Sequence, residues 1–261
     1  MRTRSRSRDA VLPAAMVLRR ASLSLRPARV RSHTVGEGGS LLPAMDASPS
    51  ISLRMPLPLP SRGQSTRVRV GTSELVLESV RGGHSLLWSD GRSARRYSLG
   101  LPDDGVMELR FCAPKFPLRV VPRDVLALVP RARLSGYLQV PLVPTLRWLA
   151  GPGPGLDVIE LAPNDLQAEW DESQGPWQRC ASSLHVRFPM RSGEAKVVVP
   201  VHVKNLGRDV LSPPFLPLHL TDADLREKRD SIVVAPRRLV WNGEAFAAVA
   251  AAGAFRAAGR S

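Results

Sequence analysis

Apolar and polar residues alternate along much of this chain with a period of two, which is the period of a β-strand that buries one face. The clearest alternation runs from Leu184 to Val203, LHVRFPMRSGEAKVVVPVHV, on both sides of Ser192-Gly193. We predict a hairpin with its turn at these two residues. In the matching register Val186 faces Val199 and every pair on that side is apolar, so the stretch predicts a half-buried antiparallel sheet.

Turn signals divide the remaining sequence from residue 66 onward into similar short strands. Asp90-Gly91 and Asn242-Gly243 favour type I′ turns, and Gly71-Thr72 separates two further alternating runs. Many of the 24 prolines stand at the ends of apolar runs, where a residue without an N–H is tolerated. Strands at intervals of about 8–12 residues with turns between them are typical of a sandwich or barrel. We therefore predict an all-β fold of antiparallel β-sandwich type, as one large or two small units.

The predicted strands form a first β block, 66–150, and a second β block, 157–250, separated by residues 151–156. This connection begins with GPGPG, a composition that favours an extended linker. The two blocks are either separate domains or the two sheets of one sandwich. Within the second block we expect a short helix capped by Thr221, and residues 251–261 form an Ala-rich tail.

The first 54 residues contain ten arginines, three acidic residues and no aromatic side chain, so they carry +7 of the chain's net charge of +14. No hydrophobic period is visible, and we expect a disordered basic segment over residues 1–65. Three interpretations stay open: an organelle transit peptide, an arm that binds nucleic acid, or sequence upstream of a true translation start at Met45 or Met55. We expect a cytoplasmic protein, or an organellar one if the segment is a transit peptide.

The cysteine count and the longest apolar stretch both bear on the cellular compartment. Cys112 and Cys180 are too few for a disulfide framework, and they predict free thiols in a reducing compartment. The most apolar stretch, 245–258, is interrupted by Gly253 and Arg256, and it is shorter than the roughly 20 residues of a membrane span. The sequence therefore predicts no integral membrane segment.

Two runs carry a resemblance to a known family: VPVHVKNLGRDVL, and PLRVVPRDVLALVPRARLSGYLQVPL before it. They resemble an uncharacterised prokaryotic all-β family, domain of unknown function 432, over about residues 66–245 of this chain. The resemblance implies an all-β fold. The family has no established activity, cofactor or catalytic residue that could be carried over to this sequence.

Motifs of common catalytic and cofactor sites are absent from the sequence. It has no phosphate-binding loop, no GxSxG serine motif and no HExxH or CxxC metal motif, so we expect no cofactor, and catalytic residues stay unknown. His185 and His202 are the best metal-ligating candidates, because the predicted hairpin makes them diagonal neighbours about 7–8 Å apart at Cα. With no third ligand identifiable, we predict no metal site beyond this pair.

Acidic residues surround two tryptophans just before the predicted hairpin. Glu169, Asp171 and Glu172 lie close in sequence to Trp170 and Trp177. Carboxylates that flank a bound sugar carry out glycoside hydrolysis, so the cluster is one candidate for acid–base chemistry. The alternative is an acidic turn that the two tryptophans anchor to the core.

Arginines gather near several predicted turns of the two blocks. The set consists of Arg92, Arg95, Arg96, Arg131, Arg133, Arg237 and Arg238. If these turns share one end of a sandwich, they form a basic rim that contacts phosphates. Aromatic residues make up only 5% of the chain, whereas proteins that bind single strands depend on stacking rings.

These observations support three hypotheses about function. The first is a non-enzymatic interaction or accessory protein that binds a protein partner through the edges or end loops of its sheets. The alternative is a nucleic-acid-associated protein that uses the Arg-rich arm and the basic rim. A second alternative is an unrecognised enzyme or metal-binding protein, for which His185, His202 or Cys180 would have to meet carboxylates in one pocket.

Overall fold

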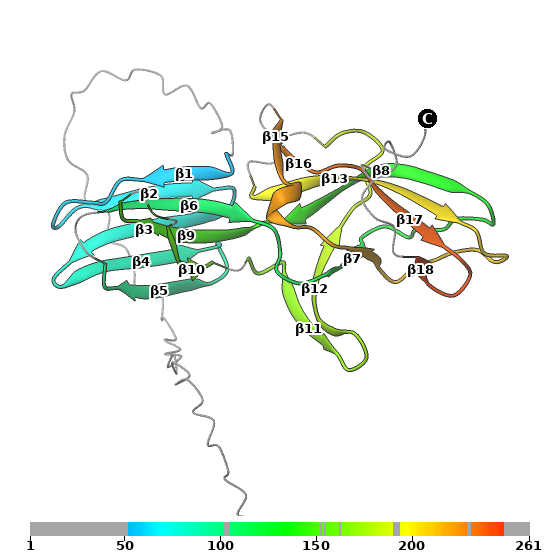
Figure 1. The fold of residues 1–261 in the computed structure, drawn as a ribbon, viewed down its shortest axis with the longest axis horizontal. Helices are drawn as coiled ribbons and strands as arrows, with labels where there is room; N and C mark the ends of the chain where they lie inside the picture. The colour runs from blue at the N-terminus through cyan, green and yellow to red at the C-terminus, as the bar shows by residue number, and fades with distance from the viewer. Residues whose placement is uncertain are drawn as a thin grey trace, which may run out of the picture. The chain divides into compact units, whose positions relative to one another are not determined.

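Strands predominate in the computed structural model of the chain, as predicted from the alternating pattern (Figure 1). The structure describes residues 52–101, 105–151, 153, 155–161, 163–189, 194–228 and 231–247. Residues 1–51 of the basic segment expected over 1–65, and the tail expected over 251–261, lie outside these residues. No helix in the described part of the chain has the length and apolar character needed to cross a membrane. The all-β prediction is confirmed.

A four-stranded meander contains two of the predicted turns. Its strands follow one another in space as in sequence: β2 (Ser65–Val70), β3 (Ser73–Val80), β4 (Gly83–Ser89) and β5 (Ala94–Leu99). At the β4–β5 turn, Asp90 Oδ1 accepts the backbone N–H groups of Arg92 (2.9 Å) and Ser93 (2.8 Å), and Gly91 has a φ of +81°. Asp90-Gly91 therefore marks a turn, but not the expected type I′ turn: Gly91 has a positive φ and Asp90 does not, and Asp90 acts as a side-chain acceptor in a four-residue connection between Ser89 and Ala94.

The second antiparallel sheet shows that two predicted boundaries are wrong, the end of the disordered segment at residue 65 and the linker at 151–156. It has the order β1 (Arg54–Leu57), β6 (Val106–Cys112), β9 (Val143–Leu149) and β10 (Leu156–Glu160). Strand β1 pairs with β6, although it lies in the segment 1–65 that we expected to be disordered. Leu156 pairs with Trp148, so the Gly/Pro segment 151–156 connects two neighbouring strands of one sheet and is not a linker between domains.

The third sheet surrounds β13 (Lys196–Asn205), the second half of the predicted hairpin. Its strand order is β15 (Arg226–Lys228), β16 (Ser231–Val233), β13, β17 (Arg237–Trp241) and β18 (Phe246–Ala247), and β8 (Arg133–Pro141) pairs with the other edge of β13. Val197, Val199, Val201 and Val203 are all buried, which confirms the predicted apolar face of this strand.

The partner predicted for β13 is wrong. Val199 lies opposite Leu138 of β8, whereas Val186, its expected partner, is 81% exposed. Residues near His185 instead lie on the far edge of β8, where the His185 N–H donates to Tyr137 O (2.9 Å) and the Tyr137 N–H donates to His185 O (2.8 Å). A side chain at Gly136 would collide with this backbone, since its Cβ would stand 2.8 Å from the His185 carbonyl oxygen.

Pro200 lies in the middle of β13, where a proline normally removes a ladder hydrogen bond. Pro200 lies opposite Tyr137 of β8. The N–H and C=O groups of Tyr137 point away from β13, so this pair has no hydrogen bond between its two residues. On the other edge, β16 pairs with Val197 and Val198, and β17 begins at Val201. Pro200 therefore falls in the gap between two partner strands, where the missing N–H costs no hydrogen bond.

The fourth sheet has the order β11 (Gln167–Asp171), β12 (Gly175–Ser182), β7 (Leu118–Pro122) and β14 (Leu216–Leu218). Strands β12 and β7 are parallel, as are the pairs that β13 forms with β16 and β17. These three parallel pairs are exceptions to the predicted antiparallel arrangement. The helix expected after Thr221 is shorter than predicted: a single 3₁₀ turn, η1 (Asp222–Asp224), precedes β15.

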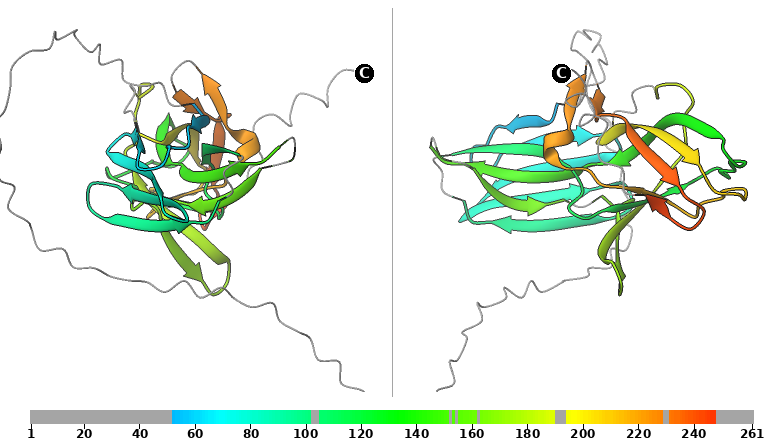
Figure 2. Two further views of the ribbon diagram at one scale, coloured as in Figure 1. Left: turned by 90° about the vertical axis from the view of Figure 1, so that its left-hand side faces the viewer. Right: turned by 45° about the vertical axis from the view of Figure 1, so that its right-hand side comes forward.

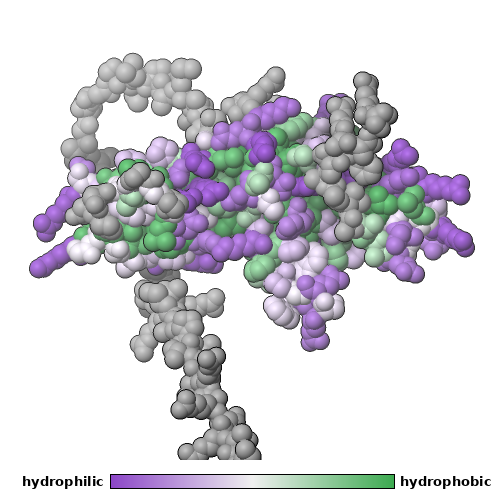
Figure 3. Space-filling model, viewed as in Figure 1, coloured by the Kyte–Doolittle hydropathy of each residue, from purple (hydrophilic) through white to green (hydrophobic). Residues whose placement is uncertain are grey.

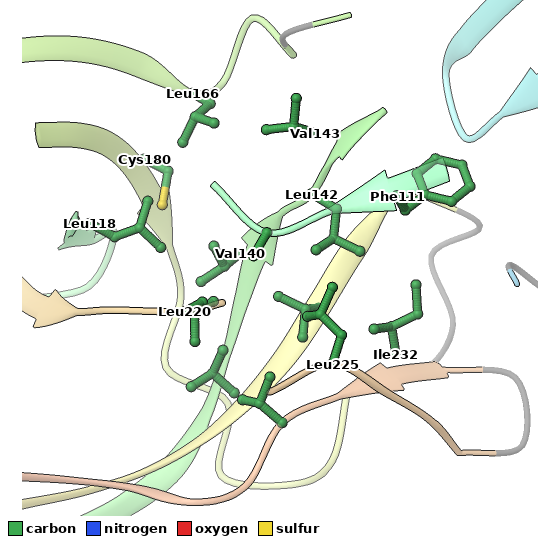
Figure 4. Close-up of a cluster of buried hydrophobic side chains, with 14 of the residues drawn as sticks. Phe111, Leu118, Val140, Leu142, Val143, Leu166, Cys180, Leu220, Leu225 and Ile232 are labelled. Atoms are coloured by element: carbon green, nitrogen blue, oxygen red, sulfur yellow. The ribbon is translucent and has the colours of Figure 1, made fainter. Parts of the chain in front are cut away.

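One continuous core joins the four sheets. The two blocks of strands are not separate domains, because β8 and β7 of the first block pair with β13, β12 and β14 of the second, and all described residues belong to one compact unit, 47–261. Only Leu142 stands between β8 and β9, and it is fully buried. Figure 4 shows Leu142 beside Val140 among the apolar side chains where the sheets meet.

Two truncations distinguish the observed strand pairing from the predicted hairpin. Leu138→Ala removes the buried partner of Val199, so it should lower the free energy of unfolding by about 2–5 kcal/mol in urea titrations. Val186→Ala should change it by less than about 0.5 kcal/mol, because this side chain is exposed. A loss at Val186 as large as the loss at Leu138 would contradict the β8–β13 register.

Candidate functional site

The seven arginines of the predicted rim do not share one end of the molecule. Arg92 lines a cavity of about 320 Å³ together with Pro141, the last residue of β8. Arg133 is the first residue of that strand. At the rise per residue of an antiparallel strand, its Cα lies roughly 27 Å from the Cα of Pro141. Arg131 lies in the turn just before β8. The single rim is therefore not formed, because the turns that carry its arginines lie at opposite ends of β8.

The remaining rim arginines differ in their surroundings. Arg95 and Arg96 lie on the edge strand β5 of the meander, where Arg96 pairs with Glu78 at 3.5 Å. Arg237 is only 12% exposed in its side chain and pairs with Asp224 at 2.9 Å, so it holds η1 against β17. Its neighbour Arg238 is exposed on the opposite face of that strand. Of the seven rim arginines, only Arg133 and Arg238 are exposed residues on strands of the β13 sheet.

The two candidate metal ligands are separated by a strand. His202 lies opposite Ser135, and His185 lies opposite Tyr137 on the other edge of β8, so β8 runs between the imidazoles. The His202 Nδ1 atom is 2.8 Å from the Ser135 hydroxyl. Among the described residues, no three His, Cys, Asp or Glu side chains lie together as metal ligands would. The structure does not bring the two histidines together at one ion.

Both cysteines are free thiols in the structure, as predicted. Cys180 is a buried residue of β12, and its burial raises the pKa of the thiol to about 12. Cys112 is half-buried and lines a cavity with His219, and burial raises the pKa of this thiol as well. Because the thiolate is the nucleophile, neither cysteine has the environment of a catalytic one.

The feature that the sequence did not reveal is the exposure of Trp170. Strands β11 and β12 form a hairpin that stands away from the rest of the described fold in every view (Figures 1 and 2). Trp170 lies near its end, opposite Pro176, and is 74% exposed. In Figure 3 the surface of the hairpin is mostly pale to purple, that is, neutral to hydrophilic.

The other face of this hairpin is held to the body by Arg119 of β7. Its guanidinium carbon lies 4.7 Å from the ring centroid of Trp177 and 5.0 Å from that of Phe215. The same guanidinium pairs with Asp171 and lies 3.8 Å from the Glu169 carboxylate. Arg119 thus contacts two rings and two carboxylates at once, which fixes the base of the hairpin.

Asp171 organises the turn of the hairpin as well as its base. Its Oδ1 atom accepts the backbone N–H (3.0 Å) and hydroxyl (2.7 Å) of Ser173, and the N–H of Gln174 (3.2 Å). These bonds and the Arg119 guanidinium hold the pKa of the Asp171 carboxyl well below its usual range. A carboxyl that stays ionised cannot serve as a general acid near neutral pH.

The arrangement does not form the acid–base cleft considered from the sequence. Glu169 and Asp171 point to the Arg119 side of β11, and Trp170 points to the other side because neighbours on a strand alternate. The expected anchoring is half correct: Trp177 contacts Arg119, but Trp170 is exposed. Arg119 had no sequence signal, since it meets Asp171 across 52 positions of the chain.

No protein-family model, curated protein or solved structure matches this chain. The resemblance to the domain of unknown function 432 therefore stays a prediction.

The pH dependence of stability tests the role of Asp171. Because the folded state lowers this pKa, the carboxylate stabilises the fold fully above about pH 4, the unfolded pKa of Asp, and progressively less as the pH falls below it. The difference in unfolding free energy between wild type and Asp171→Asn should therefore be largest at pH 7 and shrink toward pH 3 in urea titrations.

Glu172→Gln provides the matched control, because Glu172 is an exposed acid in the same turn. It should leave the stability nearly unchanged at every pH. A difference for Asp171→Asn that stays constant from pH 7 to pH 3 would contradict the proposed role of the ionised carboxylate.

Proposed function

We propose that this chain is a non-enzymatic interaction protein that docks on a protein partner through the β11–β12 hairpin. The observation that carries the proposal is Trp170, 74% exposed on a hairpin whose opposite face is fixed by Arg119. Tryptophan is the side chain most enriched at the energetic centres of protein interfaces, because it has a large apolar surface and a donor N–H.

The hairpin is suited to docking because its base is held in place, unlike that of an unbraced surface loop. Association costs conformational entropy for each group that becomes ordered, and a hairpin braced before binding avoids part of that cost. Arg119, Trp177 and Asp171 provide this brace on the face away from Trp170. The strand that carries the indole is therefore held in place before any partner arrives.

The position of β11 supports the same proposal. It is the edge strand of its sheet, so a partner segment has access to its outer side as well as to the indole. The partner that fits is a protein surface with an apolar pocket for an indole, beside an edge or loop that can meet an extended strand. The exposed Glu172 in the turn favours a basic group at the rim of that pocket.

The partner is to be identified by purifying the tagged full chain from its own cells with nuclease present. The interaction is then reconstituted with the purified partner and measured by titration calorimetry. Trp170→Ala should weaken binding by about 30-fold or more, the loss typical of a central interface residue. Its melting temperature should stay unchanged, because the side chain is exposed.

Val125→Ala is the matched control, since Val125 is an apolar residue that is 92% exposed elsewhere on the chain. It should bind the partner like wild type. A partner that binds Trp170→Ala and wild type equally well would contradict docking through this hairpin.

A further inference from the structure

The outer face of β8, β13 and β17 carries basic residues in register. Lys204 of β13 pairs with Arg133 of β8, and His202 pairs with Arg238 of β17 on the same face. Directly paired side chains project from the same side of a sheet, and neighbouring strands are about 4.8 Å apart. None of these three strands contains Asp or Glu. This face, which we call the basic face, therefore has a contiguous positive charge.

The charges of the basic face are not compensated within the described part of the chain. Arg133, Lys204 and Arg238 form no ion pair with any described residue. Arg237, one position earlier on β17, points the other way and pairs with Asp224. The alternation along β17 thus separates a structural arginine from one that is available to an external anion.

A hollow of about 450 Å³ adjoins the basic face on the same side of the sheet. Tyr137 and Phe188 line it, with ring centroids 5.4 Å apart and planes at 71°. Phe188 is 46% exposed, and Val186 beside it is 81% exposed. Ser135, His202 and Lys228 form the polar part of the lining, to which no acidic residue of the described part of the chain contributes. An exposed ring, Phe188, and a half-buried one, Tyr137, therefore lie directly beside unpaired positive charge.

We propose that the basic face and this hollow form a binding site for single-stranded nucleic acid. Phosphates would contact Arg133, Lys204 and Arg238, and an unstacked base would enter the hollow against Phe188 and Tyr137. This combination of a positive surface with stacking rings is how proteins bind single strands, whereas bases inside a duplex are not free to stack on a side chain. The site uses a surface other than the β11–β12 hairpin and does not depend on the proposed protein docking.

Fluorescence anisotropy of labelled 20-nucleotide dT and rU probes tests the site in the full chain. Residues 1–54 have a net charge of +7 and are common to every variant, so differences between variants report the folded part alone. The triple variant Arg133→Gln, Lys204→Gln, Arg238→Gln should bind more weakly. It should also reduce the slope of log affinity against log salt by about 2, that is, about 0.7 for each lost phosphate contact.

The chain offers a control with the same loss of charge. Arg92→Gln, Arg95→Gln, Arg96→Gln removes three arginines from the meander, and it should keep the wild-type salt slope. An equal loss in the two triple variants would overturn the proposal, because binding would then follow net charge alone. A duplex probe or polyglutamate bound as tightly as the dT probe at this face would overturn it too.

Base stacking is tested separately from charge. Phe188→Ala should weaken binding of both probes about tenfold, with the salt slope unchanged. Val125→Ala, an exposed apolar truncation remote in sequence, should have no effect. Wild-type affinity of Phe188→Ala would overturn the assignment of the hollow as a base site, and comparison of dT with rU shows whether the site prefers DNA or RNA.

Discussion

The antiparallel pairing of β8 with β13 is the contact on which the rest of the structure depends. It extends from Lys196 opposite Pro141 to Lys204 opposite Arg133 without a bulge. Its inner face supplies valines and leucines to the core, and its outer face carries the basic residues and Tyr137. Because only Leu142 separates β8 from β9, the same pairing also connects the β13 sheet with the sheet of β6 and β9. The regular spacing of basic residues on the outer face thus follows from the same β8–β13 register that buries the valines and leucines in the core.

The sequence predicts local features well because their causes are local. Turns at Asp90-Gly91 and Asn242-Gly243 follow from side-chain acceptors and a glycine within the turn itself. The buried face of β13 follows from alternation alone. The choice of its partner does not, because Val186 and Leu138 belong to runs that alternate in the same way. Alternation fixes which side of a strand is buried, but it does not say which strand lies next to it.

The candidate sites were harder to predict for the same reason. Arg119 holds the β11–β12 hairpin through contacts that cross three strands, and nothing in the residues around it signals that role. Because Asp171 and Glu169 pair with Arg119 on one face of the hairpin, Trp170 lies on the opposite, exposed face. Tyr137 and Phe188 meet only because the backbone near His185 packs against β8 at Gly136. The low aromatic content of the chain argued against single-strand binding, whereas the structure places two rings, Tyr137 and Phe188, in one hollow with His202.

The β8–β13 pairing is tested most directly by determining which residue lies opposite Pro200. Tyr137 and Pro200 form an antiparallel pair without mutual hydrogen bonds, in which the two Cα atoms approach to about 4.5 Å. An NMR spectrum of the labelled protein should therefore show a strong nuclear Overhauser effect between the Hα atoms of Tyr137 and Pro200. A strong effect between His185 and Pro200 instead would contradict the β8–β13 pairing and support the hairpin predicted from the sequence, with its turn at Ser192-Gly193. It would also remove the basic face and its hollow from the structure.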